Sequence, residues 1–103
     1  MDSKLKLNIC PTNQNLLTES TQGRYRLFLN DELIMDRKCK LPPGATKQEI
    51  YFSSVLKENN WFLMQNLGKN PIEIQKIFVN NNEVKINWQE QKGQGTGEFK
   101  YEN

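Results

Sequence analysis

The stretch Tyr25–Ile34 reads Y-R-L-F-L-N-D-E-L-I, and it contains the clearest local signal for the fold of this chain. Every second side chain from Tyr25 to Leu29 is apolar, which is the two-residue period of a β-strand. Asn30-Asp31 follows directly, and both residue types tolerate the left-handed backbone of a tight turn. The sequence therefore predicts a β-hairpin centred on this pair.

The same alternation recurs on both sides of the hairpin. Lys4–Cys10 places its apolar residues on one face, and Asn80–Asn82 is expected to turn the chain between two late strands. Within Ile72–Val79 the apolar set changes from even to odd positions, which indicates a β-bulge. We expect seven strands: Lys4–Cys10, Arg24–Leu29, Glu32–Lys40, Gln48–Leu56, Trp61–Leu67, Ile72–Val79 and Glu83–Trp88.

Two further connections follow from turn and breaker residues. Pro42-Pro43-Gly44 is expected to end the third strand, because proline cannot donate to a β-ladder. Lys57–Asn60 is expected to join the fourth and fifth strands as a second hairpin. Pro11–Gly23 is polar and is expected to be a connection in which Leu16-Leu17 tuck inward.

Length and composition favour a single all-β domain. The chain has 103 residues, and Ala45 is the only alanine, so a helix-rich fold is not expected. Seven short strands separated by turns predict a two-sheet antiparallel β-sandwich of jelly-roll-like layout. We assign this domain to residues 1–88. The segment 89–103, with Gly93, Gly95 and Gly97, is predicted to be a flexible C-terminal arm that adds a strand to a neighbouring subunit, or else an edge strand of the same chain or a disordered tail.

Several classes of function are not expected. A net charge of +2 argues against duplex nucleic acid, and no apolar run is long enough to cross a membrane. Histidine is absent, which removes the commonest general base and metal ligand, so neither an enzyme nor a cofactor is predicted. No signal peptide is apparent, so we expect a cytoplasmic origin. Cys10 and Cys39 are expected to be buried thiols, unless their strands lie close enough for a disulfide.

The aromatic residues suggest a binding surface. Trp61–Met64 is apolar on both faces of one strand, whereas a two-sheet sandwich buries only one face of each sheet. Either other segments of the chain cover the surplus side chains, or they contact a partner protein or a second copy. The candidate interface residues are Phe28, Trp61, Phe62, Met64, Phe99 and Tyr101.

Two alternatives remain open at this stage. Trp61 and Trp88 could form a sugar-stacking platform with amide hydrogen bonds from Asn59, Asn60 and Asn87. A groove for single-stranded nucleic acid at Arg24–Arg26 is less favoured, because on a strand the central tyrosine points away from both arginines.

The pattern of Tyr25–Ile34, of Ile50–Leu56, and of I-E-I-Q-K-I-F-V-N-N-N-E-V at Ile72–Val84 resembles small jelly-roll domains of structural proteins from marine tailed bacteriophages. Their layout is similar to that of non-catalytic carbohydrate-binding modules. The resemblance covers roughly residues 4–88. It implies a virion protein, made in the host bacterial cytoplasm, that acts as a capsid decoration or tail accessory and binds other capsid or tail proteins. Host recognition through a glycan is the alternative function.

Overall fold

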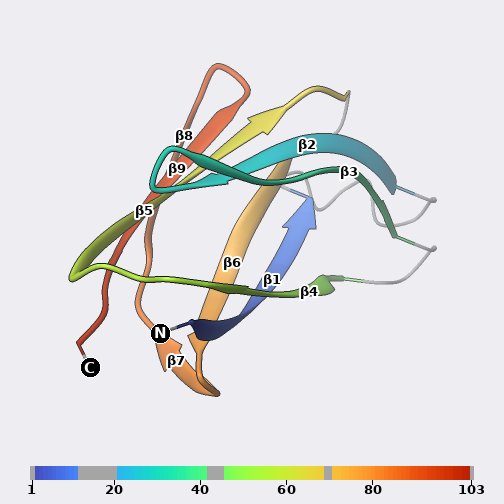
Figure 1. Ribbon diagram of the computed structural model, residues 1–103. Helices are drawn as coiled ribbons and strands as arrows, with labels where there is room; N and C mark the ends of the chain where they lie inside the picture. Colours follow the sequence, from blue (N-terminus) through green and yellow to red (C-terminus); the bar gives the residue numbers. More distant parts are fainter. Residues whose placement is uncertain (1, 12–20, 42–45, 69–70, 103) are drawn as a thin grey trace.

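A computed structural model describes residues 2–11, 21–41, 46–68 and 71–102 of the chain. Within these ranges the chain forms nine strands and no helix, arranged as two antiparallel sheets packed together (Figure 1). The predicted all-β, two-sheet sandwich is confirmed, with nine strands where seven were expected. The strands are β1 (Ser3–Pro11), β2 (Thr21–Leu29), β3 (Glu32–Leu41), β4 (Gln48–Ser54), β5 (Asn59–Asn66), β6 (Ile72–Val79), β7 (Asn82–Val84), β8 (Asn87–Gln91) and β9 (Gln94–Lys100).

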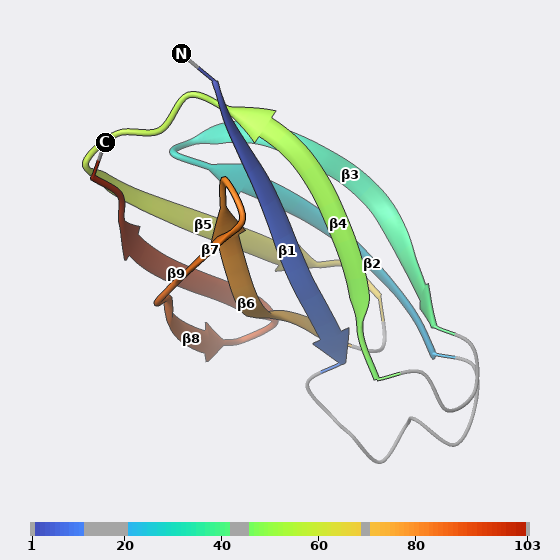
Figure 2. The ribbon, with the colours of Figure 1, turned by 90° about the horizontal axis from the view of Figure 1, so that it is seen from below.

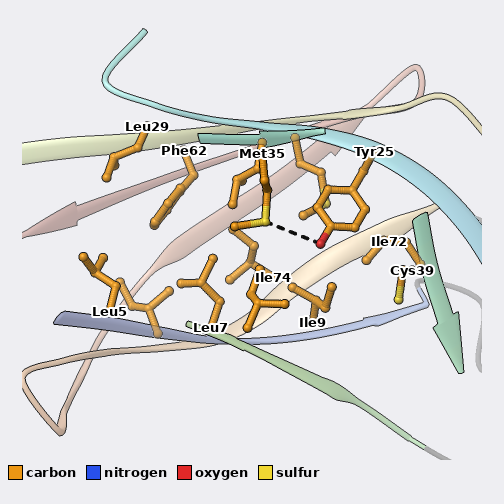
Figure 3. Packing of buried hydrophobic residues seen from close by; sticks show 14 of the residues in the cluster. Leu5, Leu7, Ile9, Tyr25, Leu29, Met35, Cys39, Phe62, Ile72 and Ile74 are labelled. Carbon is orange, nitrogen blue, oxygen red and sulfur yellow. Dashed lines mark hydrogen bonds between the residues drawn. The ribbon is translucent and has the colours of Figure 1, made fainter. Parts of the chain in front are cut away.

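The two sheets enclose a single apolar core. The four-stranded sheet has the order β4-β1-β6-β7, and the five-stranded sheet has the order β3-β2-β5-β9-β8. Side chains on the two inner faces interdigitate, because successive residues of a strand point to opposite faces. Figure 3 shows this packing, with Leu5, Leu7 and Ile9 facing Tyr25, Leu29 and Phe62 across the interior.

Both predicted asparagine turns are present. Asn30 and Asp31 have φ angles of 51° and 70°, and Asn80 and Asn81 have 49° and 71°. Two consecutive residues with positive φ are the backbone of a tight hairpin turn of type I′. The second turn is one residue shorter than expected, since Asn82 already belongs to β7.

The bulge predicted within Ile72–Val79 is also present. Asn8 of β1 pairs with Lys76 and the next residue, Ile9, pairs with Ile74, so Gln75 is the extra residue. The bulge lets the two halves of β6 bury apolar side chains of opposite parity on the same face.

The predicted hairpin between the fourth and fifth strands is wrong. β4 lies in the four-stranded sheet and β5 in the five-stranded sheet, so the segment 55–58 crosses between the layers. The two strands meet face to face, and the rings of Phe52 and Phe62 contact edge to face with centroids 6.4 Å apart. Alternation indicates that a strand has one buried face, but it does not distinguish a neighbour in the same sheet from a neighbour across the core.

The predicted single strand Glu83–Trp88 is two strands in different sheets. Lys85 and Ile86 cross from β7 to β8, yet Val84, Ile86 and Trp88 all pack against the core. These three residues are spaced two apart, so the alternation of inward and outward side chains continues across the crossing. The sequence pattern therefore resembles that of one strand.

The predicted C-terminal arm is also wrong. Residues 94–100 form β9, which lies between β5 and β8 in the five-stranded sheet. The glycine-rich segment is therefore an interior strand of the sandwich, and the boundary expected after residue 88 falls inside β8.

Three sequence expectations concern other features of the chain. Cys10 and Cys39 are both buried, as expected, and no disulfide joins them; burial raises the pKa of the Cys39 thiol. The proline stop at 42–44 and the inward tuck of Leu16-Leu17 lie outside the described residues.

Candidate functional site

Three of the six predicted interface residues lie in the core. Phe62 and Met64 have no exposed surface, and Phe99 is 3% exposed. Phe62 stacks on Phe99 with ring centroids 5.4 Å apart. These side chains cannot contact a partner while the sandwich is intact, so the prediction was wrong for them. Tyr101 is partly buried, and its hydroxyl accepts a hydrogen bond from Asn80 Nδ2 at 3.2 Å.

The other two predicted residues lie on the outer face of the five-stranded sheet. Phe28 of β2 pairs with Leu63 of β5 on one side and with Leu33 of β3 on the other. Trp61 precedes Leu63 by two residues and so projects from the same face. Leu33 is 51% exposed, and the other three are partly exposed. We call Leu33, Phe28, Leu63 and Trp61 the outer apolar row.

A bulge in β3 completes this row. Leu27 pairs with Met35 and the next residue, Phe28, pairs with Leu33, so Ile34 is the extra residue. Met35 and Ile34 both pack toward the core. Without the extra residue, Leu33 would share the inward parity of Met35, so the bulge is what turns Leu33 outward beside Phe28.

Trp61 is one of the residues that line a surface groove of about 490 Å³. It lies where the chain crosses from β7 to β8, and β5 and β9 contribute most of its other residues. We call it the Trp61 groove. Its lining residues are Asn59, Asn60, Trp61, Val84, Lys85, Asn87, Glu98, Phe99 and Lys100. An indole surrounded by amide, carboxylate and ammonium groups combines an apolar surface with hydrogen-bonding partners.

Asn60 belongs to the scaffold of this groove and is not available to a ligand. Its Oδ1 accepts from the Lys57 backbone N–H at 2.8 Å and from Asn30 Nδ2 at 2.9 Å. Its Nδ2 donates to the Lys57 carbonyl at 2.8 Å. Asn30 Oδ1 in turn accepts from the Trp61 backbone N–H at 3.0 Å. The β2–β3 turn and the start of β5 are thus joined by side-chain amides, which fix the backbone that carries Trp61.

Trp88 does not share a platform with Trp61. Trp88 pairs with Gly97, and its indole lies over Gly97 and Gly95 on the inner side of β9. A Cβ at Gly97 would lie 2.7 Å from the Trp88 ring, so only glycine fits beneath it. Trp61 projects outward and Trp88 inward, so the two indoles do not lie side by side on one face of the sheet, although both line a second surface hollow together with Asn87. Trp61, Asn59 and Asn87 are the candidate sugar contacts in the Trp61 groove.

Charged side chains border the opposite end of the same outer face. Arg26 Nε lies 3.1 Å from Asp36 Oδ2, and Arg24 Nε lies 3.5 Å from Asp36 Oδ1. The hydrogen bond from Arg26, assisted by Arg24, lowers the pKa of the Asp36 carboxyl. Tyr25 between the two arginines is fully buried, as the strand pattern predicted. The arginines therefore form an exposed ion-pair cluster with Asp36, and the aromatic ring between them in sequence faces the core.

Six residues of these surfaces were not predicted from the sequence. Leu33 and Leu63 belong to the outer apolar row, and Val84, Lys85, Glu98 and Lys100 line the Trp61 groove. The three successive apolar residues Leu33–Met35 are a signal for a bulge that could have been recognised. The groove residues had no such signal, because they follow from the positions of β9 and of the β7–β8 crossing.

Comparison of the chain with models of protein families, with curated proteins and with solved structures finds no match. Among the described residues, no group of His, Cys, Asp or Glu is arranged to hold a metal ion. The same part of the chain has no helix with the length and apolar character needed to cross a membrane.

Proposed function

We propose that this protein is a non-enzymatic structural component of a tailed bacteriophage particle, a capsid decoration or tail accessory, that binds another virion protein through the outer apolar row. The single observation that carries the proposal is the row itself. Leu33, Phe28 and Leu63 stand side by side on three strands whose opposite faces already fill the core. Burying such a patch is worth roughly 25 cal/mol per Å² of apolar area, and contiguous patches of this kind usually mark interfaces.

The phage setting rests on the pattern resemblance of Tyr25–Ile34 and Ile72–Val84. The exposed arginine cluster at the other end of the face supports a protein partner, because a polar rim around an apolar centre is the usual composition of an interface.

The experiment uses particles of a tailed phage whose genome encodes this chain. Mass spectrometry of purified particles is expected to find the chain, and recombinant protein is expected to rebind to particles from which it has been stripped. Leu63→Lys is expected to abolish rebinding. Gln65→Lys, two residues further along the same face of β5, is the matched control and should retain it. Absence of the chain from the particles, or rebinding by Leu63→Lys equal to that of the control, would reject the proposal.

A second candidate function is glycan binding in the Trp61 groove, and the composition of the groove supports it. Trp61 offers an indole for a sugar ring, while Asn59, Asn87 and Glu98 offer hydrogen bonds. In a Trp88→Phe background, Trp61 is the only tryptophan, so its fluorescence reports on this groove alone. A shift upon titration with one member of a glycan panel, lost in Asn87→Ala, supports this function. No response to any glycan removes it.

A further inference from the structure

The edge strands of the two sheets, which we call their margins, differ in the features that keep another strand from pairing with them. β3 is the outermost strand of the five-stranded sheet, and it contains a bulge together with Arg37 and Lys38. Arg37 pairs with the buried Tyr25, so it stands at an inward-facing position of the margin. Bulges and inward-facing charges are the devices that keep another strand from adding to an edge.

β4 forms a margin of the four-stranded sheet and has none of these devices (Figure 2). Its sequence, Q-E-I-Y-F-S-S, contains no lysine, arginine or proline, and its pairing with β1 has no register shift. The other margins are shorter, since β7 has three residues and β8 has five. β4 is therefore the margin best suited to pair with another strand.

Side chains at β4 point to the same conclusion. Tyr51 is 67% exposed, and Val55, immediately after the strand, is 61% exposed. Exposed apolar surface at one margin is costly to an isolated domain.

We propose that the chain forms a two-fold dimer in which β4 pairs antiparallel with the β4 of a second copy, centred on Tyr51. Such an axis, perpendicular to the sheet, keeps the inner faces of both copies on the same side. It joins two four-stranded sheets into one continuous sheet of eight strands and satisfies the outward backbone groups of both margins.

In this register, the β4 side chains of the two copies that lie opposite each other are compatible in charge and polarity. Ile50 lies opposite Phe52 of the second copy and extends the core. Gln48 lies opposite Ser54, and Glu49 lies opposite Ser53. No like charges meet, and Tyr51 lies beside its own copy on the axis. All seven residues of β4 are paired, which no other register of this symmetry achieves.

This inference deepens the proposed function by naming a second copy as one partner, and it rests on that function only for its biological purpose. The surface involved is different: β4 lies in the four-stranded sheet, and the outer apolar row lies on the other sheet. A Leu63→Lys protein that dimerises but does not bind particles and a β4 variant that stays monomeric report on separate claims.

Cross-linking tests the register directly. Tyr51→Cys places two thiols opposite each other on the axis, within the Cα separation of about 4.4–6.8 Å that a disulfide requires. Ser53→Cys is the matched control on the same face, and its two thiols would be offset by four residues, or ~13 Å along the strand. The native Cys10 and Cys39 are buried and should not compete. Mild oxidation is expected to yield a covalent dimer from Tyr51→Cys alone. Equal cross-linking of both variants would overturn the register.

Sedimentation equilibrium tests the dimer itself. The unmodified chain is expected to sediment with the mass of two chains at high concentration. Tyr51→Glu places a carboxylate opposite Lys6 within one copy, which the fold tolerates, and opposite its own image in the dimer, which repels it. This variant is expected to remain folded by circular dichroism and to be monomeric, whereas Gln91→Glu on β8 should dimerise normally. A monomeric unmodified chain at every soluble concentration, or a dimer that persists in Tyr51→Glu, would refute the proposal.

Discussion

The two tryptophans lie on neighbouring parts of one sheet and have opposite surroundings. Trp88 of β8 lies inward over Gly95 and Gly97, and its Nε1 is buried without a hydrogen-bond partner among the described residues. Trp61 of β5 projects outward into a groove between amide and charged side chains. The difference follows from strand parity relative to the core, since both residues are the same chemical group.

The surroundings of the two indoles indicate different roles. An indole that fills space above two glycines contributes mainly to stability. An indole on an outer face contributes little to stability and presents apolar area to a ligand. We therefore expect substitutions at the two sites to have opposite profiles, and the following predictions test this expectation.

The largest effect is expected at Gly95. A methyl group there would overlap the Trp88 indole, so Gly95→Ala should lower the free energy of unfolding by about 3 kcal/mol or more. Urea denaturation followed by circular dichroism measures the change. In a Trp88→Ala background the added methyl group has room, and the same substitution should become nearly neutral. A large penalty that persists in that background would show that space beneath Trp88 is not the cause.

Removing the indoles gives the direct comparison. Trp88→Ala should lower the free energy of unfolding by about 2–4 kcal/mol, because it empties a partly buried site in the core. Trp61→Ala should lower it by less than about 1 kcal/mol, because the side chain packs only on an outer face. Thermal unfolding of both variants measures the difference. Equal losses would mean that Trp61 is also a structural residue.

Tyr25 lies in the same apolar interior as Trp88, and its phenol should ionise only at a higher pH than that of a free tyrosine. Burial raises the pKa of this phenol from 10.0 to about 12, against the lowering effect of the Arg37 charge, and its hydroxyl donates to Met35 Sδ at 3.6 Å. The unfolded chain loses the phenol proton first. The contribution of the neutral phenol to the free energy of unfolding is therefore fully present below pH 10. It is lost between pH 10 and pH 12, which lowers the free energy of unfolding by about 2–3 kcal/mol in total.

Denaturant midpoints measured across this alkaline range check the loss. Tyr25→Phe removes the titrating group, and its stability should show a correspondingly smaller decline. A Tyr25→Phe protein with the same alkaline profile as the unmodified chain would assign the loss to other groups.

The smallest of the four effects is expected at the support of Trp61. Asn60→Ala removes three side-chain hydrogen bonds and leaves Lys57 and Asn30 groups unpaired, so we expect a loss of about 2 kcal/mol. The change should also shift the emission of Trp61 in a Trp88→Phe background. The exposed neighbour Asn59 is the control, and Asn59→Ala should change stability by less than about 0.5 kcal/mol. Similar losses for both would contradict the scaffold role of Asn60.

Much of the architecture was accessible from local pattern. The alternation around Tyr25–Leu29 identified the buried face of β2, and Asn30-Asp31 identified the turn after it. The parity change between Ile74 and Ile77 identified the bulge. These features depend on neighbours within a few residues, and local backbone preferences are encoded in the sequence there.

The sequence predicted less well which side chains lie in the core and which lie on the surface. Phe62 and Met64 were predicted at an interface because Trp61–Met64 is apolar on both faces, and parity alone does not identify which face is inside. Gly95 and Gly97 were interpreted as a flexible arm because glycine is typical of flexible segments, whereas here it makes room for Trp88. The first error concerns burial between the two sheets, and the second concerns a contact across the β8–β9 hairpin, whose place inside the sandwich depends on the pairing of β9 with β5.

The sequence by itself determined that the chain forms short alternating strands with tight asparagine turns, because those preferences arise from side-chain period and backbone sterics. Only the tertiary structure decided which strands share a sheet, which tryptophan lies inside, and that β4 is left as an unprotected margin. The reason is that pairing and burial are set by competition among all strands for one core, and that competition involves residues far apart along the chain.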